Sequence, residues 1–257
     1  MFGKVKISTL LALGAMALPA FGFPQNAASG ARDAMAPASP KVSGSVHSTG
    51  NVNGNNAMLG KVSITPHDKY SSSVGVLGCK INTNRVAYWP STPDCNNVCV
   101  KLSYAGRSVH LLQIDASGGA HDISYDAWNF LKTGHSVKEP GQAFAGGGFE
   151  VDFEYVSANE CKSLITDGTG KLPIAAANGL NWLTSCLGGS WVGNNYQLYN
   201  IQDPICHYGY DEKCSLAAGS NQPTCPHQLG ANPKLDNPSD HKVVNLLYPT
   251  GQEEVAP

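Results

Sequence analysis

One continuous stretch, residues 95–131, constrains the fold of this chain more than any other part of the sequence. It contains two closely spaced cysteines, a strand, a tight turn, a second strand, an acidic residue, a Gly-rich loop and a short helix. In this order the loop brings Asp115, His121 and Asp122 to the end of a strand. The stretch predicts a mainly β barrel that presents polar side chains to a ligand.

The first 22 residues have the features of a secretory signal. Lys4 and Lys6 precede an apolar run over 8–21, and Ala20-Phe21-Gly22 fits a small-x-small cleavage site. The run is shorter than the roughly 20 residues of a membrane-spanning helix, and no later segment is long or apolar enough to cross a bilayer. We therefore expect a secreted, extracellular protein that does not associate with membranes.

Composition limits the partners and the chemistry. The net charge is −2, charged residues make up 14% of the chain, and Lys and Arg form no basic stripe, which argues against a nucleic-acid partner. An even number of cysteines, eight, indicates disulfides in an exported protein rather than a metal site. We expect a monomer with no metal and no cofactor.

The composition changes along the chain divide it into five parts. The segment 23–59 is rich in Ala, Pro, Ser, Gly and Asn and cannot bury enough apolar surface to offset its ordering entropy. The expected parts are a signal peptide (1–22), a disordered linker (23–59), a β-barrel domain (60–161), a Cys-rich helical or irregular extension (162–225) and a flexible tail (226–257).

Three elements stand out within these parts. Residues 149–156 alternate apolar and acidic side chains, which predicts a strand with one buried face. A helix is expected over 125–131, with Ser124 as its N-cap and Gly134 after its end. A second helix is expected over 174–187 because Pro173 precedes it and Gly188-Gly189 follows.

Several short motifs occur in an order that resembles the double-psi β-barrel superfamily, which includes RlpA-like and expansin-like proteins, barwin, cerato-platanins and family 45 endoglucanases. The motifs are Leu77-Gly78-Cys79, Cys95 to Cys99, Gly106-Arg107-Ser108-Val109, Ile114-Asp115, Ala120 to Ser124 and Gly147 to Cys161. Two departures are the extra residue between Cys95 and Cys99 and the His at 121, where the family has an aromatic residue. The resemblance implies a six-stranded double-psi barrel of the fungal secreted type, with no counterpart for 162–257.

The resemblance also implies a disulfide pattern. By similarity to cerato-platanin-type barrels, Cys79 would pair with Cys95, and Cys99 with Cys161. The remaining four cysteines would form disulfides among themselves within the extension and its tail. They are Cys186, Cys206, Cys214 and Cys225.

Two carboxylates are the catalytic candidates. The family's hydrolases use the residue matching Asp122 as a general acid, and Asp68 is the best candidate for the base that an inverting hydrolase also needs. Each has a structural alternative, since Asp122 would also favour a helix N-terminus and Asp68 also suits a turn. Asp115 would either hold its loop or bind sugar hydroxyls, and His121 is a further candidate contact.

Aromatic side chains near the expected groove are candidates for stacking on sugar rings. Tyr70, Tyr88, Trp89 and Tyr125 are the substrate-binding candidates, with exposure expected most for the Tyr88-Trp89 loop. Packing in the core from the short helix is the alternative for Tyr125 and for Trp128, and for Trp128 the core is expected.

The resemblance leads to a first hypothesis of a secreted protein that binds cell-wall polysaccharide, or a host apoplastic protein, without hydrolysis. A role as a fungal effector or virulence factor follows from the same resemblance. Two alternatives are a family 45-like inverting endoglucanase and a barwin-like protease inhibitor.

Overall fold

The computed structural model describes residues 59–235 and 242–257. The predicted signal peptide and nearly all of the predicted linker lie outside these residues. No helix in the described part of the chain is long and apolar enough to span a bilayer.

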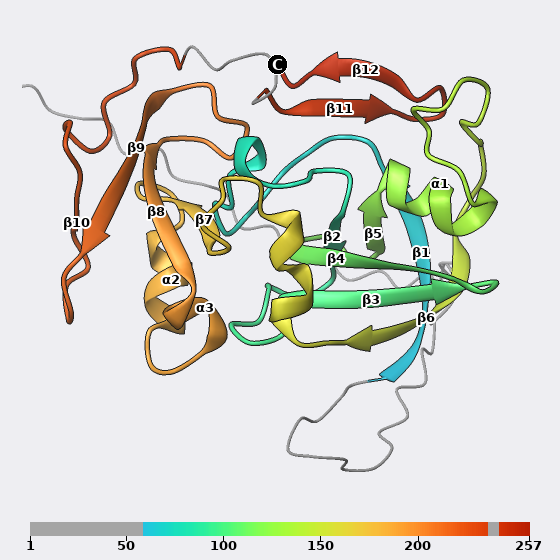
Figure 1. Ribbon diagram of the computed structural model, residues 1–257, viewed down its shortest axis with the longest axis horizontal. Helices are drawn as coiled ribbons and strands as arrows, with labels where there is room; N and C mark the ends of the chain where they lie inside the picture. Colours follow the sequence, from blue (N-terminus) through green and yellow to red (C-terminus); the bar gives the residue numbers. More distant parts are fainter. Residues whose placement is uncertain (1–58, 236–241) are drawn as a thin grey trace, which may run out of the picture. The chain divides into compact units, whose positions relative to one another are not determined.

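Six strands close into a barrel in the order β1-β5-β2-β4-β3-β6 (Figure 1). The pairs β1·β5 and β2·β4 are parallel, and the other four pairs are antiparallel. This closed barrel of mixed pairing confirms the predicted double-psi fold class. The strands are β1 (Leu59–His67), β2 (Val86–Trp89), β3 (Cys99–Tyr104), β4 (Arg107–Ala116), β5 (His121–Ser124) and β6 (Phe149–Tyr155).

Alternation along the strands fills the barrel interior with apolar side chains. In β6, Val151 and Phe153 are buried, whereas Glu150 and Asp152 are exposed, as the sequence predicts. The buried cluster inside the barrel also takes one or more side chains from each other strand: Ile64, Ala87, Trp89, Val100, Leu102, Val109, Leu111 and Ile123.

Helix α1 (Tyr125–Thr133) follows β5 directly and buries Trp128 completely, so its predicted position in the core is confirmed. Gly134 ends the helix in the left-handed conformation, at φ 91°, and its N–H donates to Phe130 O. Arg107 donates to the carbonyls of Leu131 and Lys132, which have no partner within the helix. Ser124 is the N-cap residue, as predicted, but its side chain forms no capping hydrogen bond.

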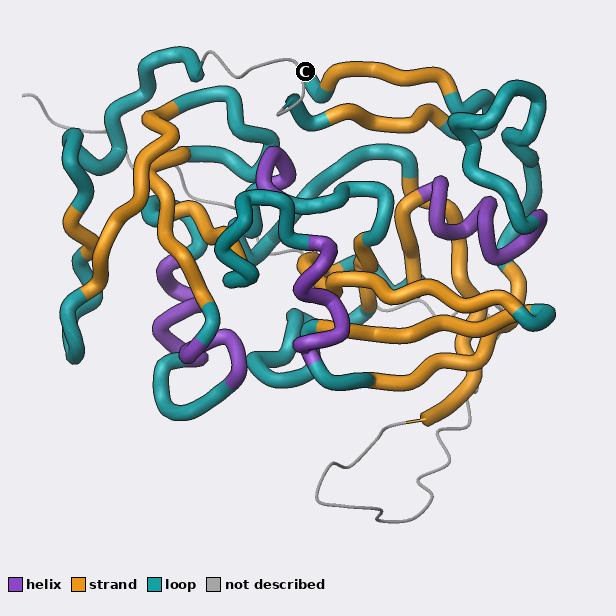
Figure 2. Tube along the Cα trace, viewed as in Figure 1, coloured by secondary structure: helices purple, strands orange, loops and turns teal. Residues whose placement is uncertain are grey.

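The extension after the barrel is more regular than the sequence predicts (Figure 2). Its four strands form a sheet in the order β10-β9-β8-β7, accompanied by two short helices. These elements are β7 (Leu172–Ala175), α2 (Leu180–Cys186), α3 (Trp191–Asn194), β8 (Tyr196–Ile201), β9 (Gly209–Leu216) and β10 (Pro223–Thr224).

The predicted helix over 174–187 is wrong in its first half. Its first residues belong to β7, which pairs in parallel with β8. Gly179 then lets the chain turn back onto this strand, because a Cβ there would lie 2.2 Å from Ile174 Cγ2. Close packing against a second strand therefore overrides the helical preference of the alanines that follow Ile174.

Two of the four disulfides fasten the extension to the barrel domain, and the other two close within one part each. Cys99 pairs with Cys161, as the resemblance implies, and Cys214 pairs with Cys225 inside the extension. The expected Cys79–Cys95 bond is wrong: the observed bonds are Cys79–Cys206 and Cys95–Cys186. Cys79 and Cys95 both lie beside the extension, whose Cys206 and Cys186 are their partners.

Apolar packing joins the same two parts. Val76, just before the 3₁₀ turn at Gly78–Lys80, forms an antiparallel bridge to Ile174 of β7. Both side chains are fully buried in a cluster that includes Ile114 of β4 and Leu183 of α2. The extension is therefore part of one continuous core with the outer face of the barrel strands.

The end of the chain forms a hairpin, so the prediction of a flexible tail is wrong for 242–257. Strands β11 (Val244–Leu247) and β12 (Gln252–Val255) pair antiparallel. Leu246 is 4% exposed and packs in the same cluster as Tyr125 and Val137, near helix α1 (Figure 1). Burial of this leucine and of its neighbours provides the free energy that orders the segment.

Candidate functional site

Asp122 lies in the middle of β5, with β1 on one side and β2 on the other. Its register partners are Thr65 of β1 and Tyr88 of β2. The Thr65 hydroxyl donates a hydrogen bond to Asp122 Oδ1, and the carboxylate is partly buried. The barrel thus holds the Asp122 carboxylate in a fixed position, where it accepts one hydrogen bond from Thr65.

His121 precedes Asp122 and is also partly buried. Its ring meets the Trp89 ring edge-on, with the centroids 4.8 Å apart. Burial lowers the His121 pKa from its ordinary value of 6.5, and the negative charge of Asp122 acts in the opposite direction. At neutral pH the imidazole is therefore mainly uncharged and offers one donor and one acceptor.

Asp115, at the end of β4, holds a loop in place. Its carboxylate accepts hydrogen bonds from the Ser71 hydroxyl at 2.5 Å and the Ser73 N–H at 2.9 Å. The residue is 8% exposed. Of the two roles considered from the sequence, the geometry matches the structural one, because these donors occupy the oxygens that would otherwise meet a ligand.

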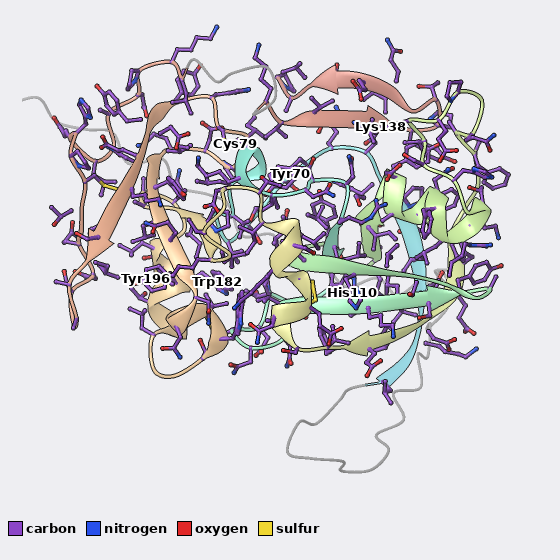
Figure 3. The ribbon with its side chains drawn as sticks, viewed as in Figure 1. Tyr70, Cys79, His110, Lys138, Trp182 and Tyr196 are labelled. Atoms are coloured by element: carbon purple, nitrogen blue, oxygen red, sulfur yellow. A yellow bond between two sulfur atoms is a disulfide. The ribbon has the colours of Figure 1, made fainter. Side chains whose placement is uncertain are left out.

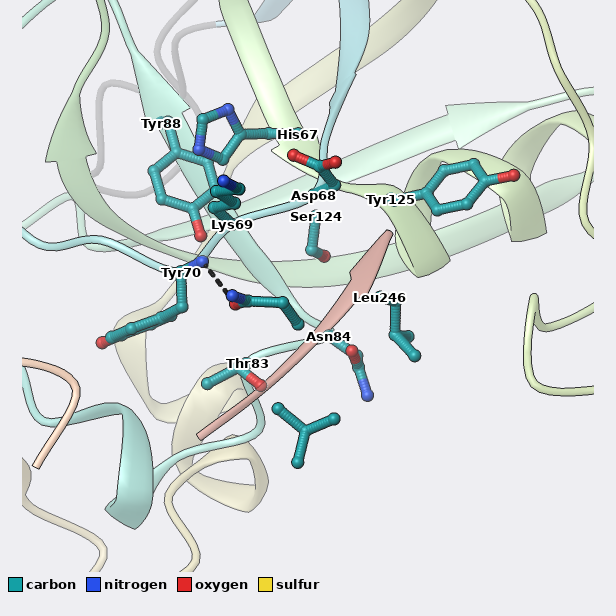
Figure 4. Close-up of a pocket in the computed structure, with 12 residues that line it drawn as sticks. His67, Asp68, Lys69, Tyr70, Thr83, Asn84, Tyr88, Ser124, Tyr125 and Leu246 are labelled. Carbon is teal, nitrogen blue, oxygen red and sulfur yellow. Dashed lines mark hydrogen bonds between the residues drawn. The ribbon is translucent and has the colours of Figure 1, made fainter. Parts of the chain in front are cut away.

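Asp68 lies just after β1, beside a small cavity of about 20 Å³ (Figure 4). Such a volume holds little more than one water molecule. Asp68 Oδ2 accepts the backbone N–H of Tyr248 at 3.2 Å, and Asn245 Oδ1 accepts the N–H of Tyr70 at 2.9 Å. The C-terminal hairpin therefore contacts the carboxylate that the sequence suggested as a base.

The structure gathers several of the predicted residues around this cavity but leaves others outside it. Asp68, Tyr70, Tyr88 and Tyr125 line it, together with Ser124. Asp122 and His121 are not among the lining residues, so the two carboxylates proposed as an acid–base pair do not share this cavity.

The expectation of exposed aromatic rings is wrong. Tyr70, Tyr88, Trp89 and Tyr125 are only 7, 4, 3 and 1% exposed, respectively. Their apolar faces pack in the two core clusters, and burial raises the pKa values of Tyr70 and Tyr88 well above the usual range. None of the four rings is available to stack on a sugar.

Two Gly-rich loops adjoin the strands that carry Asp122 and Thr65. In the loop before His121, a Cβ added at Gly118 or Gly119 would meet no atom within 4 Å. The loop before β6 runs close to β1, because a Cβ at Gly148 would lie 3.1 Å from Thr65 Cγ2. The polar groups at this position are the Thr65 hydroxyl, the His121 imidazole and the Asp122 carboxylate, with the Trp89 ring beside His121.

Sequence reasoning missed three contributors to this region. Thr65 is recognisable only once the β1·β5 register is known. Asn245 and Tyr248 lie about 180 residues after their partners Tyr70 and Asp68, and no local motif signals such a contact. Among residues 59–235 and 242–257, no group of three or more His, Cys, Asp or Glu side chains is placed to hold an ion.

A closed six-stranded barrel of mixed pairing, with a disulfide-linked extension, defines the structural class of this protein. No protein-family model matches the chain, and its sequence matches no curated protein. Two solved structures are similar to part of it, cerato-platanin 3 and cerato-platanin 2 from M. perniciosa. They share 16 and 19% identity with TM-scores of 0.31 and 0.30, and each match covers 40% of this chain and 98% of the cerato-platanin.

Proposed function

We propose that this protein is secreted and binds a cell-wall polysaccharide, without hydrolysing it, at the surface formed by Thr65, His121 and Asp122. All eight cysteines are paired in disulfides, which fits an oxidising extracellular compartment. An action at a host surface, as an effector or virulence factor, is part of the same proposal.

One observation supports binding over hydrolysis: Asp68 and Asp122, the two carboxylates considered as base and acid, do not line a common cavity. Asp122 accepts from Thr65, Asp115 from the loop at 71–73, and Asp68 from the backbone of Tyr248. Inverting hydrolysis needs a second carboxylate free to activate water on the far side of the sugar. Asp115 is held in a structural role, and Asp68 lines a cavity that Asp122 does not reach.

The chemistry of the surface suits a neutral, hydroxyl-rich ligand. An uncharged imidazole, a threonine hydroxyl and a carboxylate can each exchange hydrogen bonds with sugar hydroxyls. The adjoining Gly-rich loop gives a polymer close access to these groups and to the backbone.

The test combines binding and activity on the same preparation. The protein is incubated with insoluble cellulose, chitin and peptidoglycan, and the unbound fraction and the released reducing ends are both measured. The proposal predicts depletion by at least one polymer and no reducing ends above background.

Soluble β-glucans serve as a second substrate, with Asp122→Asn as the matched variant. Release of reducing sugar that this variant loses would show a hydrolase and overturn the binding-only proposal. Absence of binding to every polymer would overturn the carbohydrate proposal as a whole.

A further inference from the structure

A second and larger hollow lies away from Asp122, where the C-terminal hairpin begins. It has a volume of about 490 Å³, within the range of roughly 300–1,000 Å³ that ligand pockets occupy. Its walls come from the loop after the 3₁₀ turn at Gly78–Lys80, from the end of the 3₁₀ turn at Ala158–Leu164 and from the start of β11. We call this hollow the hairpin groove.

Uncharged polar groups and cationic groups make up most of the hairpin groove. Its lining includes the amides of Asn82 and Asn84, the hydroxyls of three Ser and Thr residues, and two ammonium groups. No Asp or Glu occurs among its described lining residues. The lining is Gly78, Cys79, Ile81, Asn82, Thr83, Asn84, Lys138, Ser163, Thr166, Lys242 and Val244.

The two lysines are accessible to a ligand. Lys242 is exposed and forms no ion pair with any residue in the described part of the chain. Lys138 lies beside the hairpin (Figure 3) and pairs with Glu253 Oε1 at 2.9 Å, with the two side chains 48 and 58% exposed. An ion pair this exposed is weak, so an incoming carboxylate can take the place of Glu253 at Lys138.

We propose that the hairpin groove binds an acidic oligosaccharide, a chain of sugars that carries uronic-acid carboxylates. The lysines would pair with the carboxylates, and the amides and hydroxyls would bind the sugar hydroxyls. This site shares no residue with the surface at Asp122, so either proposal can fail while the other holds.

The experiment measures binding of oligogalacturonate to the full-length protein by calorimetry, with a neutral cello-oligosaccharide of the same length as the reference. The acidic ligand should bind more tightly, and its affinity should fall as salt is raised to about 1 M, where charges are screened beyond about 3 Å. The double variant Lys138→Ala with Lys242→Ala should bind oligogalacturonate about tenfold more weakly, since each exposed charge contributes a factor of up to about five to the affinity.

Matched controls separate a local effect from a change in net charge. Lys171→Ala with Lys213→Ala removes two exposed lysines outside the groove and should leave the affinity unchanged. Asp122→Asn should also leave it unchanged. Equal affinity for acidic and neutral oligosaccharides, or an equal loss in the two double-lysine variants, would overturn the proposal.

Discussion

Cys95, in the loop before β3, forms a disulfide with Cys186 at the end of α2, 91 residues later in the sequence. A bond over this span restricts the unfolded chain strongly, by about 4 kcal/mol in the chain-entropy account. We predict that replacing both cysteines by alanine lowers the free energy of unfolding by about that amount, measured by denaturant titration.

The Cys214–Cys225 bond is the internal control, because it spans only 11 residues and closes a loop within the extension. Removing this bond should lower the free energy of unfolding by about 2–3 kcal/mol, which is less than the loss expected for the Cys95–Cys186 bond. Non-reducing peptide mapping should recover Cys95 linked to Cys186. Recovery of Cys79 linked to Cys95 would contradict the arrangement described above.

The bond from Thr65 to Asp122 should be measurable as a coupling between β1 and β5. A hydrogen bond to a charged group contributes about 1.5–3 kcal/mol, and this one is only partly buried. A double-mutant cycle with Thr65→Val and Asp122→Asn should therefore give a coupling energy of about 1–2 kcal/mol. A coupling near zero would mean that the two side chains do not interact in solution.

His121 should make stability depend on pH in a defined direction. Because burial lowers its folded pKa below 6.5, the unfolded chain binds more protons than the folded one as pH falls through this region. Stability should then decrease as pH falls from about 6.5 towards the folded pKa. The variant His121→Gln should lack this contribution when unfolding is compared at several pH values.

The pKa of His121 also depends on the charge of the adjacent Asp122. The charge of Asp122 raises the His121 pKa against the larger effect of burial. Asp122→Asn should therefore lower the His121 pKa further, as followed by NMR titration of the imidazole. A rise in the pKa of His121 would contradict the placement of these two residues side by side.

Gly179 is predicted to tolerate no side chain, although its backbone conformation is an ordinary one, at φ −94° and ψ −6°. An added Cβ would lie 2.2 Å from Ile174 Cγ2 and 2.9 Å from Val74 O. Gly179→Ala should lower the free energy of unfolding by about 1–3 kcal/mol, because the added methyl group overpacks this site. Gly188→Ala, where a Cβ meets nothing within 4 Å, should be close to neutral in the same unfolding measurement.

The barrel was predictable because its signals are local. Alternation in β6, the Gly after α1 and the order of short motifs between Leu77 and Cys161 are all readable within a few residues. The partners of Cys79 and Cys95 were not predictable in this way, since eight cysteines allow 105 pairings and spacing does not choose among them.

The sequence indicates which residues form the site better than it indicates how exposed their side chains are. Asp122 and His121 lie at the end of the Gly-rich loop, as the sequence suggests. Tyr88 and Trp89 look like loop residues next to Pro90, but pairing of β2 with β4 and β5 buries them on both faces. The contact of Asp68 with the Tyr248 backbone depends on a hairpin whose docking has no sequence motif.

The most direct test of the proposed function is the binding isotherm of Asp122→Ala on the insoluble polymer that retains the wild-type protein. Asp152→Ala, an exposed acidic residue on β6, is the matched control. We predict that Asp122→Ala weakens binding of the polymer about fivefold or more, which corresponds to about 1 kcal/mol of binding free energy. Asp152→Ala should bind the polymer like wild type. Identical isotherms for the three proteins would contradict it.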